Sequence, residues 1–257
     1  MQDIKPKQLS DEEVAFVAQY LNLNHDIAGV KQHIYTVWHK CIASMHAYRC
    51  IQTFAFLKPR ICNHFCFPQL LEMLNKPACT RFCDLGACFG TDTRYLLTQV
   101  QNNNLNTTII DLVNDYWNFG KQLFMEQQVA SKAAKFHFNE KFGDFCDPVF
   151  AAQFTGQFHV IWCGAVLHVL SKQGVVEFLK HAFQSLVDNG NAMLIGTCVG
   201  LAASSGGPSE WEFESPNTKV RYLHTSESLH QLLTQIGFSQ VEVRESKHSL
   251  MSSNSSL

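Results

Sequence analysis

Three aspartates that each follow a short apolar run are the residues best placed to do chemistry. Asp84 closes the run TRFCDL, Asp111 closes TTIIDL, and Asp144 lies in GDFCD. Two glycines, Gly86 and Gly90, flank a loop that starts directly after Asp84. Glycines let a ligand lie against bare backbone, and carboxylates accept hydrogen bonds from ammonium, hydroxyl and amino groups. Together these residues could hold a polar, partly cationic small molecule.

The spacing of the glycines separates two kinds of ligand. A dinucleotide site uses G-x-G-x-x-G, whereas the loop from Gly86 to Gly90 lacks the central glycine, which argues against a nicotinamide-dependent oxidoreductase. Asp84 instead suits an ammonium group, directly or through water. Asp111 suits the two hydroxyls of a ribose, and Asp144 suits an adenine amino group. The order predicts a nucleoside that carries an amino acid. The alternative is that these aspartates only cap helices.

The elements that must position these residues alternate along the chain after Lys76. The runs TRFCDL, TTIIDL, KFHFN, FHVIWC and NAMLIGTC predict buried strands. Helical periodicity covers Asp92–Gln101, Tyr116–Gln128 and Lys172–Leu186. This alternation predicts a parallel sheet with right-handed crossovers, so the carboxyl ends of the strands meet at one edge. A further helix that stops at Gly237 and a last strand over QVEVRES complete the expected order.

The two ends of the chain differ from this middle part. Residues 1–76 predict a helical N-terminal cap lobe, with Ser10 as the N-cap of its first helix. Residues 77–250 form the expected ligand-binding domain, and residues 251–257 are too polar to pack and predict a disordered tail. The segment Gly200–Asn217 lacks a clear period, which fits a substrate loop or a solvated connection equally.

Composition narrows the class of partner. The 257 residues include 20 Lys and Arg against 22 Asp and Glu, without a basic cluster, so we expect no nucleic acid as partner. No apolar stretch is long enough for a membrane span and Met1–Ser10 lacks the core of a signal peptide, so we expect a cytoplasmic protein that binds a small molecule. Homodimer formation stays open.

Cysteines are frequent but do not indicate a metal site. The 10 cysteines lie mostly inside apolar runs, where a thiol packs as a small hydrophobe, and we expect them to be reduced. Cys62 and Cys66 are spaced C-x3-C, as are Cys79 and Cys83, but no accompanying histidine pattern completes a zinc site. We therefore expect no metal.

The glycine loop also resembles a known family. The segment FCDLGACFGTDTRYLL is similar to the first motif of the class I, Rossmann-like S-adenosylmethionine-dependent methyltransferases, in the version DLGxCxGxDxR where Cys88 replaces the middle glycine. That version is typical of the small fungal natural-product methyltransferases, including those that esterify a carboxylate of meroterpenoids. The segments YRCIQTFAFLKPRI, DLVNDYWNFGKQLF, WCGAVLHVLSKQGVVEFL and LHTSESLHQLLTQIG resemble further motifs of this subgroup. Arg49, Gln52 and Ser171 depart from its pattern, which indicates a different substrate.

This resemblance implies a fold, a cofactor and a set of site residues. The fold is a doubly wound, mostly parallel, seven-stranded Rossmann-like sheet with a helical N-terminal cap. The cofactor is S-adenosyl-L-methionine. The catalytic candidate is His168, as base or orienting group, and Tyr48 and His224 are the substrate-binding candidates, although His224 also suits a local role beside a helix cap. The implied cofactor-binding residues are Asp84, Gly86, Ala87, Cys88, Gly90, Asp111, Leu112, Asp144, Phe145 and Cys163.

The expected reaction is transfer of a methyl group to an oxygen of a small hydrophobic metabolite in secondary metabolism. A carboxylate acceptor is already ionised near neutral pH and needs no strong base, whereas a phenol or amine needs one. Two alternatives remain open at this point. One is N-methylation of a small aromatic amine, and the other is a protein that binds S-adenosylmethionine without transferring its methyl group.

Overall fold

A five-stranded parallel sheet forms the centre of the computed structural model, which describes residues 6–45, 48–126, 137–188, 190–202, 208–214 and 220–246. The strand order is β3-β2-β1-β4-β5. Central β1 pairs with β2 and β4, so that Phe82 is level with Thr107 on one side and Val160 on the other. The prediction of a parallel α/β sheet is thus confirmed. The bounds are β1 Arg81–Leu85, β2 Asn106–Asp111, β3 Phe138–Phe142, β4 Val160–Gly164 and β5 Met193–Thr197.

The number of strands differs from the prediction of seven. Strands β6 (Glu210–Glu214) and β7 (Val220–His224) pair with each other in an antiparallel hairpin, and the sheet itself contains five strands among the residues described. The expected last strand in QVEVRES is wrong, because residues 241–246 have no strand pairing. The side chain of Arg244 there lies over the ring of Phe65, 4.2 Å from its centroid. The alternation of apolar residues predicted a strand here, but it does not determine whether a neighbouring strand is available for pairing.

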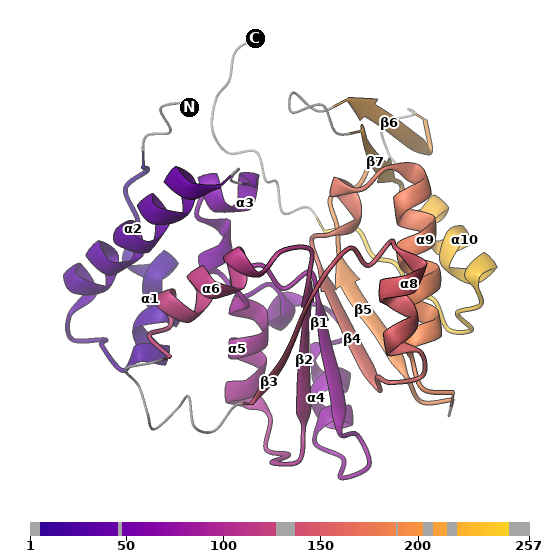
Figure 1. Ribbon diagram of the computed structural model, residues 1–257, viewed down its shortest axis with the longest axis horizontal. Coiled ribbons are helices and arrows are strands. Elements are labelled where there is room, and N and C mark those ends of the chain that lie inside the picture. Colours follow the sequence, from indigo (N-terminus) through magenta and orange to yellow (C-terminus); the bar gives the residue numbers. More distant parts are fainter. Residues whose placement is uncertain are drawn as a thin grey trace.

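Helices cover both faces of the sheet (Figure 1). On one face, Phe82 and Trp162 pack with α4 (Phe67–Leu74) and α5 (Thr91–Gln99). On the other, neighbouring residues such as Cys83 and Cys163 pack with α9 (Lys172–Ser185) and α10 (Ser226–Ile236). Successive residues of a strand point to opposite faces, and the central strands β1 and β4 bury side chains on both. Short α8 (Pro148–Ala151) and the 3-10 helix η3 (Ala152–Phe154) complete this second layer.

The described N-terminal residues form several helices. The helices are α1 (Asp11–Leu21), α2 (Ile27–Ser44) and α3 (Arg49–Gln52), followed by the 3-10 helices η1 (Ala55–Leu57) and η2 (Ile61–Asn63). Ser10 caps α1, and its hydroxyl accepts from the Glu13 N–H at 3.2 Å. The Glu13 carboxylate in turn accepts from the Ser10 N–H at 3.0 Å, which completes a capping box.

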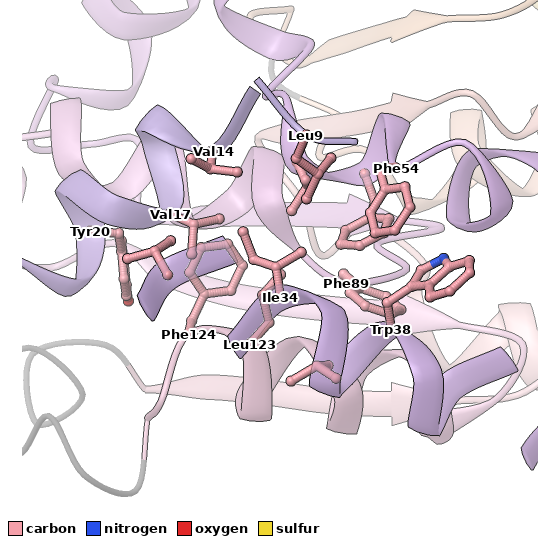
Figure 2. Close-up of a cluster of buried hydrophobic side chains, with 14 of the residues drawn as sticks. Leu9, Val14, Val17, Tyr20, Ile34, Trp38, Phe54, Phe89, Leu123 and Phe124 are labelled. Atoms are coloured by element: carbon pink, nitrogen blue, oxygen red, sulfur yellow. The ribbon is translucent and has the colours of Figure 1, made fainter. Parts of the chain in front are cut away.

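One hydrophobic cluster joins these helices to the rest of the molecule. Figure 2 shows Ile34 and Trp38 of α2 packed beside Phe89, a residue of the glycine loop, and Leu123 at the end of α6 (Asn114–Leu123). The indole N–H of Trp38 donates to the Ile51 carbonyl at 2.8 Å, which fixes α3 against α2. The N-terminal helices therefore share a core with the loop that they border. The predicted tail, residues 251–257, lies outside the described residues.

The structure also describes helix lengths, the cysteines and the groups of side chains that could bind metal. None of the described helices is both long and apolar enough to cross a bilayer. All ten cysteines are free thiols. Within the described part of the chain, no three His, Cys, Asp or Glu side chains converge as metal ligands would. Helix α10 begins at Thr225 with a capping box and ends at Gly237, as the sequence predicted.

Candidate functional site

The glycine loop between β1 and α5 has a backbone that only glycine allows at two positions. Gly86 and Gly90 have φ values of 86° and 66°. A Cβ atom on Gly86 would lie 2.2 Å from Val166 Cγ2, and one on Gly90 would lie 2.1 Å from the ring of Trp117. Cys88 also has a positive φ, of 51°. The loop thus makes a tight turn whose glycines cannot be replaced without strain.

A buried arginine holds the far side of this loop. The Arg94 guanidinium is fully buried and donates to the carbonyls of Phe89 at 2.7 Å and Gly90 at 3.0 Å. It pairs with Glu126 at 2.6 Å and stacks over the Trp117 ring at 4.3 Å from the centroid. These contacts preorganise the loop, since the charge is both paired and hydrogen-bonded.

Asp84 lies beneath the loop rather than on its surface. Its side chain is buried and accepts a hydrogen bond from the Thr93 hydroxyl. Burial raises the pKa of Asp84 to about 8, although the Thr93 hydrogen bond acts in the opposite direction. A carboxyl group that is costly to ionise here would become an anion if a cation were brought close to it.

Asp111 joins the end of β2 to the glycine loop. Its Oδ2 accepts from the Cys88 N–H at 2.7 Å, and its Oδ1 accepts from the Leu112 N–H at the same distance. Burial raises the pKa of Asp111, and these backbone donors oppose the rise. The sequence-predicted ribose residue and the predicted loop are therefore parts of one site.

The third predicted carboxylate lies in the loop that follows β3. Asp144 is exposed, and its Oδ1 accepts from the Cys146 N–H at 2.8 Å. Phe145 is buried, with its carbonyl accepting from His181 Nδ1 at 2.9 Å. The Gly143 N–H donates to the Asp111 carbonyl at 2.9 Å, which holds this loop against the end of β2.

The remaining cofactor candidates lie around the same edge. The Ala87 carbonyl accepts from the Gly90 N–H at 2.7 Å and so closes the turn. Leu112 follows Asp111 directly and exposes 47% of its surface. Cys163 is buried in β4, where burial raises its thiol pKa and Asp84 adds to the rise.

The catalytic candidate His168 lies in η4 (Leu167–Val169), just after β4. Its Nδ1 accepts from the Val199 N–H at 3.4 Å, which leaves Nε2 to carry the proton of the neutral ring. Burial, with smaller contributions from the charges of Arg221 and Arg60, lowers the pKa of His168 to about 4. The ring is thus a neutral hydrogen-bonding group near pH 7 and a weak base.

The substrate candidate Tyr48 lies close to the cofactor candidates. Its ring is 5.3 Å from that of Tyr116, and burial raises its pKa, with smaller contributions from Asp111 and Cys88. Arg221 opposes this rise. Tyr48 and Cys88 of the glycine loop pack against the same hydrophobic cluster.

His224, the second substrate candidate, has local contacts. It is buried in β7, its Nδ1 lies 3.3 Å from the Ser228 hydroxyl, and its ring packs edge-on against Tyr222. Its other nitrogen, Nε2, is buried without a hydrogen-bond partner among the described residues. Strand β7, which carries His224, packs against η4, which carries His168. The side-chain contacts of His224 among the described residues are with Ser228 and Tyr222.

Three residues at this edge were not singled out from the sequence. The Cys88 thiol donates a hydrogen bond to Cys50, and this bond, with the Arg60 charge, lowers the pKa of Cys50. Arg60 and Arg221 both act on His168. Cys50 and Arg60 stand within the segment YRCIQTFAFLKPRI, which was a usable signal, whereas nothing near Arg221 in the sequence indicated its place.

Curated proteins with similar sequences are fungal methyltransferases. The chain is 26% identical over 151 residues to methyltransferase adrK of Penicillium roqueforti, and 25% identical over 149 residues to methyltransferase adrK of Penicillium rubens. Each match covers 58% of this chain and 51% of the relative. The chain thus spans about half the length of the curated relatives it matches. No family model matches it. These matches confirm the resemblance to fungal methyltransferases.

Solved structures of methyltransferases are more distant. The 1,6-didemethyltoxoflavin-N1-methyltransferase of Burkholderia thailandensis, with S-adenosylhomocysteine bound, is 15% identical and has a TM-score of 0.46, with 93% of this chain and 84% of that chain covered. An S-adenosylmethionine-dependent methyltransferase of Mesorhizobium loti is 14% identical with a TM-score of 0.45, over 70% and 83% of the two chains.

Proposed function

We propose that this protein is an S-adenosylmethionine-dependent methyltransferase that methylates an oxygen, of a carboxylate or a phenol, on a small hydrophobic metabolite. The main support is the 2.7 Å hydrogen bond from the Cys88 N–H to Asp111, because it joins the glycine loop and the next strand end into one site. Similarity to two Penicillium methyltransferases supports the same class of activity.

The residues around the loop fit this cofactor. Gly86 and Gly90 allow the tight turn of the loop, because a Cβ on either would meet the side chain of Val166 or Trp117, and Asp84 offers a carboxyl group at the end of β1. Asp111 would accept from the ribose, while Asp144 and Phe145 would flank the adenine. The site would therefore offer the carboxyl group of Asp84 to a cation, that of Asp111 to the ribose hydroxyls, and the loop of Asp144 to the adenine base.

When bound, S-adenosylmethionine would supply an electrophilic methyl group. The chain would contribute orientation, since holding the acceptor in line can lower a barrier by about 7–11 kcal/mol. Tyr48 and the N-terminal cap, residues 1–76, would cover this edge of the sheet. His168 would present its Nε2 N–H to the acceptor and so orient it.

The weak basicity of His168 favours one acceptor over others. A ring with a pKa of about 4 is a poor base for a phenol, whose pKa is about 10. A carboxylate is ionised near neutral pH without help. We therefore place carboxylic acids first among the oxygen acceptors, ahead of phenols and aromatic amines.

Release of S-adenosylhomocysteine tests this function directly. The full chain would be incubated with S-adenosylmethionine and a panel of hydrophobic carboxylic acids, phenols and aromatic amines. Turnover with acids or phenols is expected, and mass spectrometry of the product would locate the methyl group on oxygen. Turnover confined to amines would contradict O-methylation, and cofactor binding with no turnover on any class would support the non-transferring alternative.

A further inference from the structure

Two thiols from separate parts of the chain meet beside the glycine loop, and their sulfur atoms have no role in the proposed methyl transfer. Cys50 lies in α3 of the N-terminal helices, and Cys88 lies in the loop between β1 and α5. A hydrogen bond between the side chains joins them, with the Cys88 thiol as donor. Both also pack against one hydrophobic cluster, together with Tyr48. The fold therefore holds two sulfur atoms in contact at the edge of the candidate site.

The segment that follows α3 is fixed to the glycine loop by contacts of its own. The Phe56 ring lies 4.5 Å from the ring of Phe89 in the loop, measured between centroids. The Phe56 carbonyl accepts from the hydroxyl of Thr91, the first residue of α5, at 2.6 Å. Cys50 and Cys88 thus meet within a packed contact between two segments, which holds them at a short separation.

Cys50 is the more reactive of the two thiols. The hydrogen bond from Cys88 lowers the pKa of Cys50 to about 7, against the effect of burial and with a further contribution from the Arg60 charge. About half of the Cys50 side chains are therefore thiolates near neutral pH, and the thiolate is the form that reacts with oxidants. Both residues are partly exposed, so a small oxidant can reach them. Cys88 is the adjacent thiol that an oxidised Cys50 would need.

We propose that Cys50 and Cys88 form a reversible disulfide that opposes cofactor binding. With hydrogen peroxide as oxidant, the Cys50 thiolate attacks one oxygen and the O–O bond breaks, which leaves a sulfenic acid and a hydroxide that takes up a proton. The Cys88 sulfur then attacks the Cys50 sulfur, the S–O bond breaks, and the hydroxyl leaves with the Cys88 proton as water. Two thiols are oxidised, and one peroxide is reduced to two waters. A dithiol reductant reverses the change.

The disulfide would act on the cofactor site through the backbone of Cys88. The Cys88 N–H donates to Asp111 Oδ2 at 2.7 Å, in a turn where Cys88 has a φ of 51°. A covalent bond holds two sulfurs closer than a hydrogen bond does, so its formation displaces the loop, α3 or both. A cofactor that binds the undisplaced loop must oppose the disulfide by the same factor. This effect on the cofactor rests on the proposed methyltransferase function, whereas formation of the disulfide does not.

Peroxide treatment of the full chain tests both parts. Peptide mass spectrometry without reductant, after remaining thiols are blocked, should show Cys50 linked to Cys88, and dithiothreitol should remove the link. Calorimetry should show that S-adenosylhomocysteine binds the oxidised protein at least about tenfold more weakly, with recovery on reduction. Saturation with S-adenosylhomocysteine before peroxide is added should slow the linkage.

Two serine variants make the test specific. Cys50→Ser should form no link at Cys88 and should keep its S-adenosylhomocysteine affinity after peroxide. The matched control is Cys62→Ser, which changes a partly exposed cysteine whose pKa is raised by burial, and it should keep both the linkage and the loss of affinity. Unchanged thermal midpoints of the reduced variants would show that they are folded.

The outcomes separate this inference from the proposed function. A link from Cys50 to another cysteine, such as Cys41, or oxidation of Cys50 without any link, overturns the proposal. A link between Cys50 and Cys88 that leaves the S-adenosylhomocysteine affinity unchanged also overturns it, because the disulfide would then not affect the cofactor. If the reduced wild-type protein does not bind S-adenosylhomocysteine, the methyltransferase proposal fails, and the mass spectrum still shows whether the two thiols pair.

Discussion

At the scale of single residues, the site depends on ionisable groups that the fold keeps away from water. Asp84 is the clearest example, because its pKa of about 8 lies well above the usual value near 3.9. Between these two pH values the folded protein holds a proton that the unfolded chain has lost. The contribution of Asp84 to stability therefore falls as pH rises through this window and is level above pH 8.

Cofactor binding should release this proton. A cationic ligand near Asp84 favours its ionised form, so the affinity for S-adenosylmethionine should rise with pH between 6 and 8 more steeply than in Asp84→Asn. The asparagine variant can still accept from Thr93 but cannot ionise. Calorimetry at several pH values, in buffers of different ionisation enthalpy, would count the protons released. Identical pH profiles for the two proteins would show that Asp84 does not face the cation.

Arg94 is a second buried ionisable residue, and its charged side chain stabilises the glycine loop. In Arg94→Met, Glu126 would lose its partner and the carbonyls of Phe89 and Gly90 would lose their donor. We expect the free energy of unfolding to drop by about 3–5 kcal/mol. Urea denaturation would measure it. The matched control is Arg244→Met, where an exposed pair with Glu242 should contribute less than about 1 kcal/mol. Equal losses would mean that the buried pair does not support the loop.

At the scale of elements, the glycine loop meets the N-terminal helices through two thiols. Cys50 lies in α3 and Cys88 in the loop, and the Cys88 thiol donates to Cys50, which lowers the pKa of Cys50. Under native conditions, iodoacetamide should modify Cys50 with a pH midpoint below the usual value of about 8.5.

A variant and a control residue make this measurement specific. Cys88→Ala removes the donor, so the midpoint for Cys50 should move up toward the ordinary value. Cys146, whose pKa burial raises to about 12, should stay unmodified over the same range and serves as the internal control. Peptide mass spectrometry would follow each thiol. A midpoint that does not change in Cys88→Ala would contradict the contact between loop and cap.

The elements themselves were largely predictable because their signals are local. Strands β1, β2, β4 and β5 each contain a short apolar run, and α10 is marked by Thr225 at its start and Gly237 at its end. Strand β3 begins at Phe138, within the predicted run KFHFN, and continues to Phe142. The expected last strand failed because its alternation of apolar residues says nothing about whether a strand edge is free beside it.

The candidate site was predictable only in part, because local sequence patterns do not show which distant residues pack together. Asp84 and Asp111 could be proposed from the sequence because parallel topology brings strand ends together. The place of Arg221 could not, since it depends on the packing of β7 on η4, which involves residues far apart in the chain. The burial of Asp84 was also beyond the sequence, because it depends on how Thr93 of α5 lies over the end of β1.

At the scale of the whole molecule, three parts of the chain converge on the carboxyl edge of the sheet. The N-terminal helices contribute Tyr48, Cys50 and Arg60, and the sheet contributes Asp84 and Asp111. The hairpin adds Arg221, next to η4 with His168. The shared core of Figure 2 ties the first of these parts to the glycine loop. A change in the N-terminal helices should therefore alter cofactor binding as well as substrate binding.

The most direct test of the central claim is calorimetric titration of the full chain with S-adenosylmethionine and, separately, with NADH. Saturable binding of S-adenosylmethionine at one site is expected, with no binding of NADH. Asp111→Ala should weaken the S-adenosylmethionine affinity by at least about tenfold, because two ribose hydrogen bonds to a charged group are lost. Binding of NADH, or failure of the folded wild-type protein to bind S-adenosylmethionine, would contradict the account and leave Asp84, Asp111 and Asp144 as structural residues at strand ends.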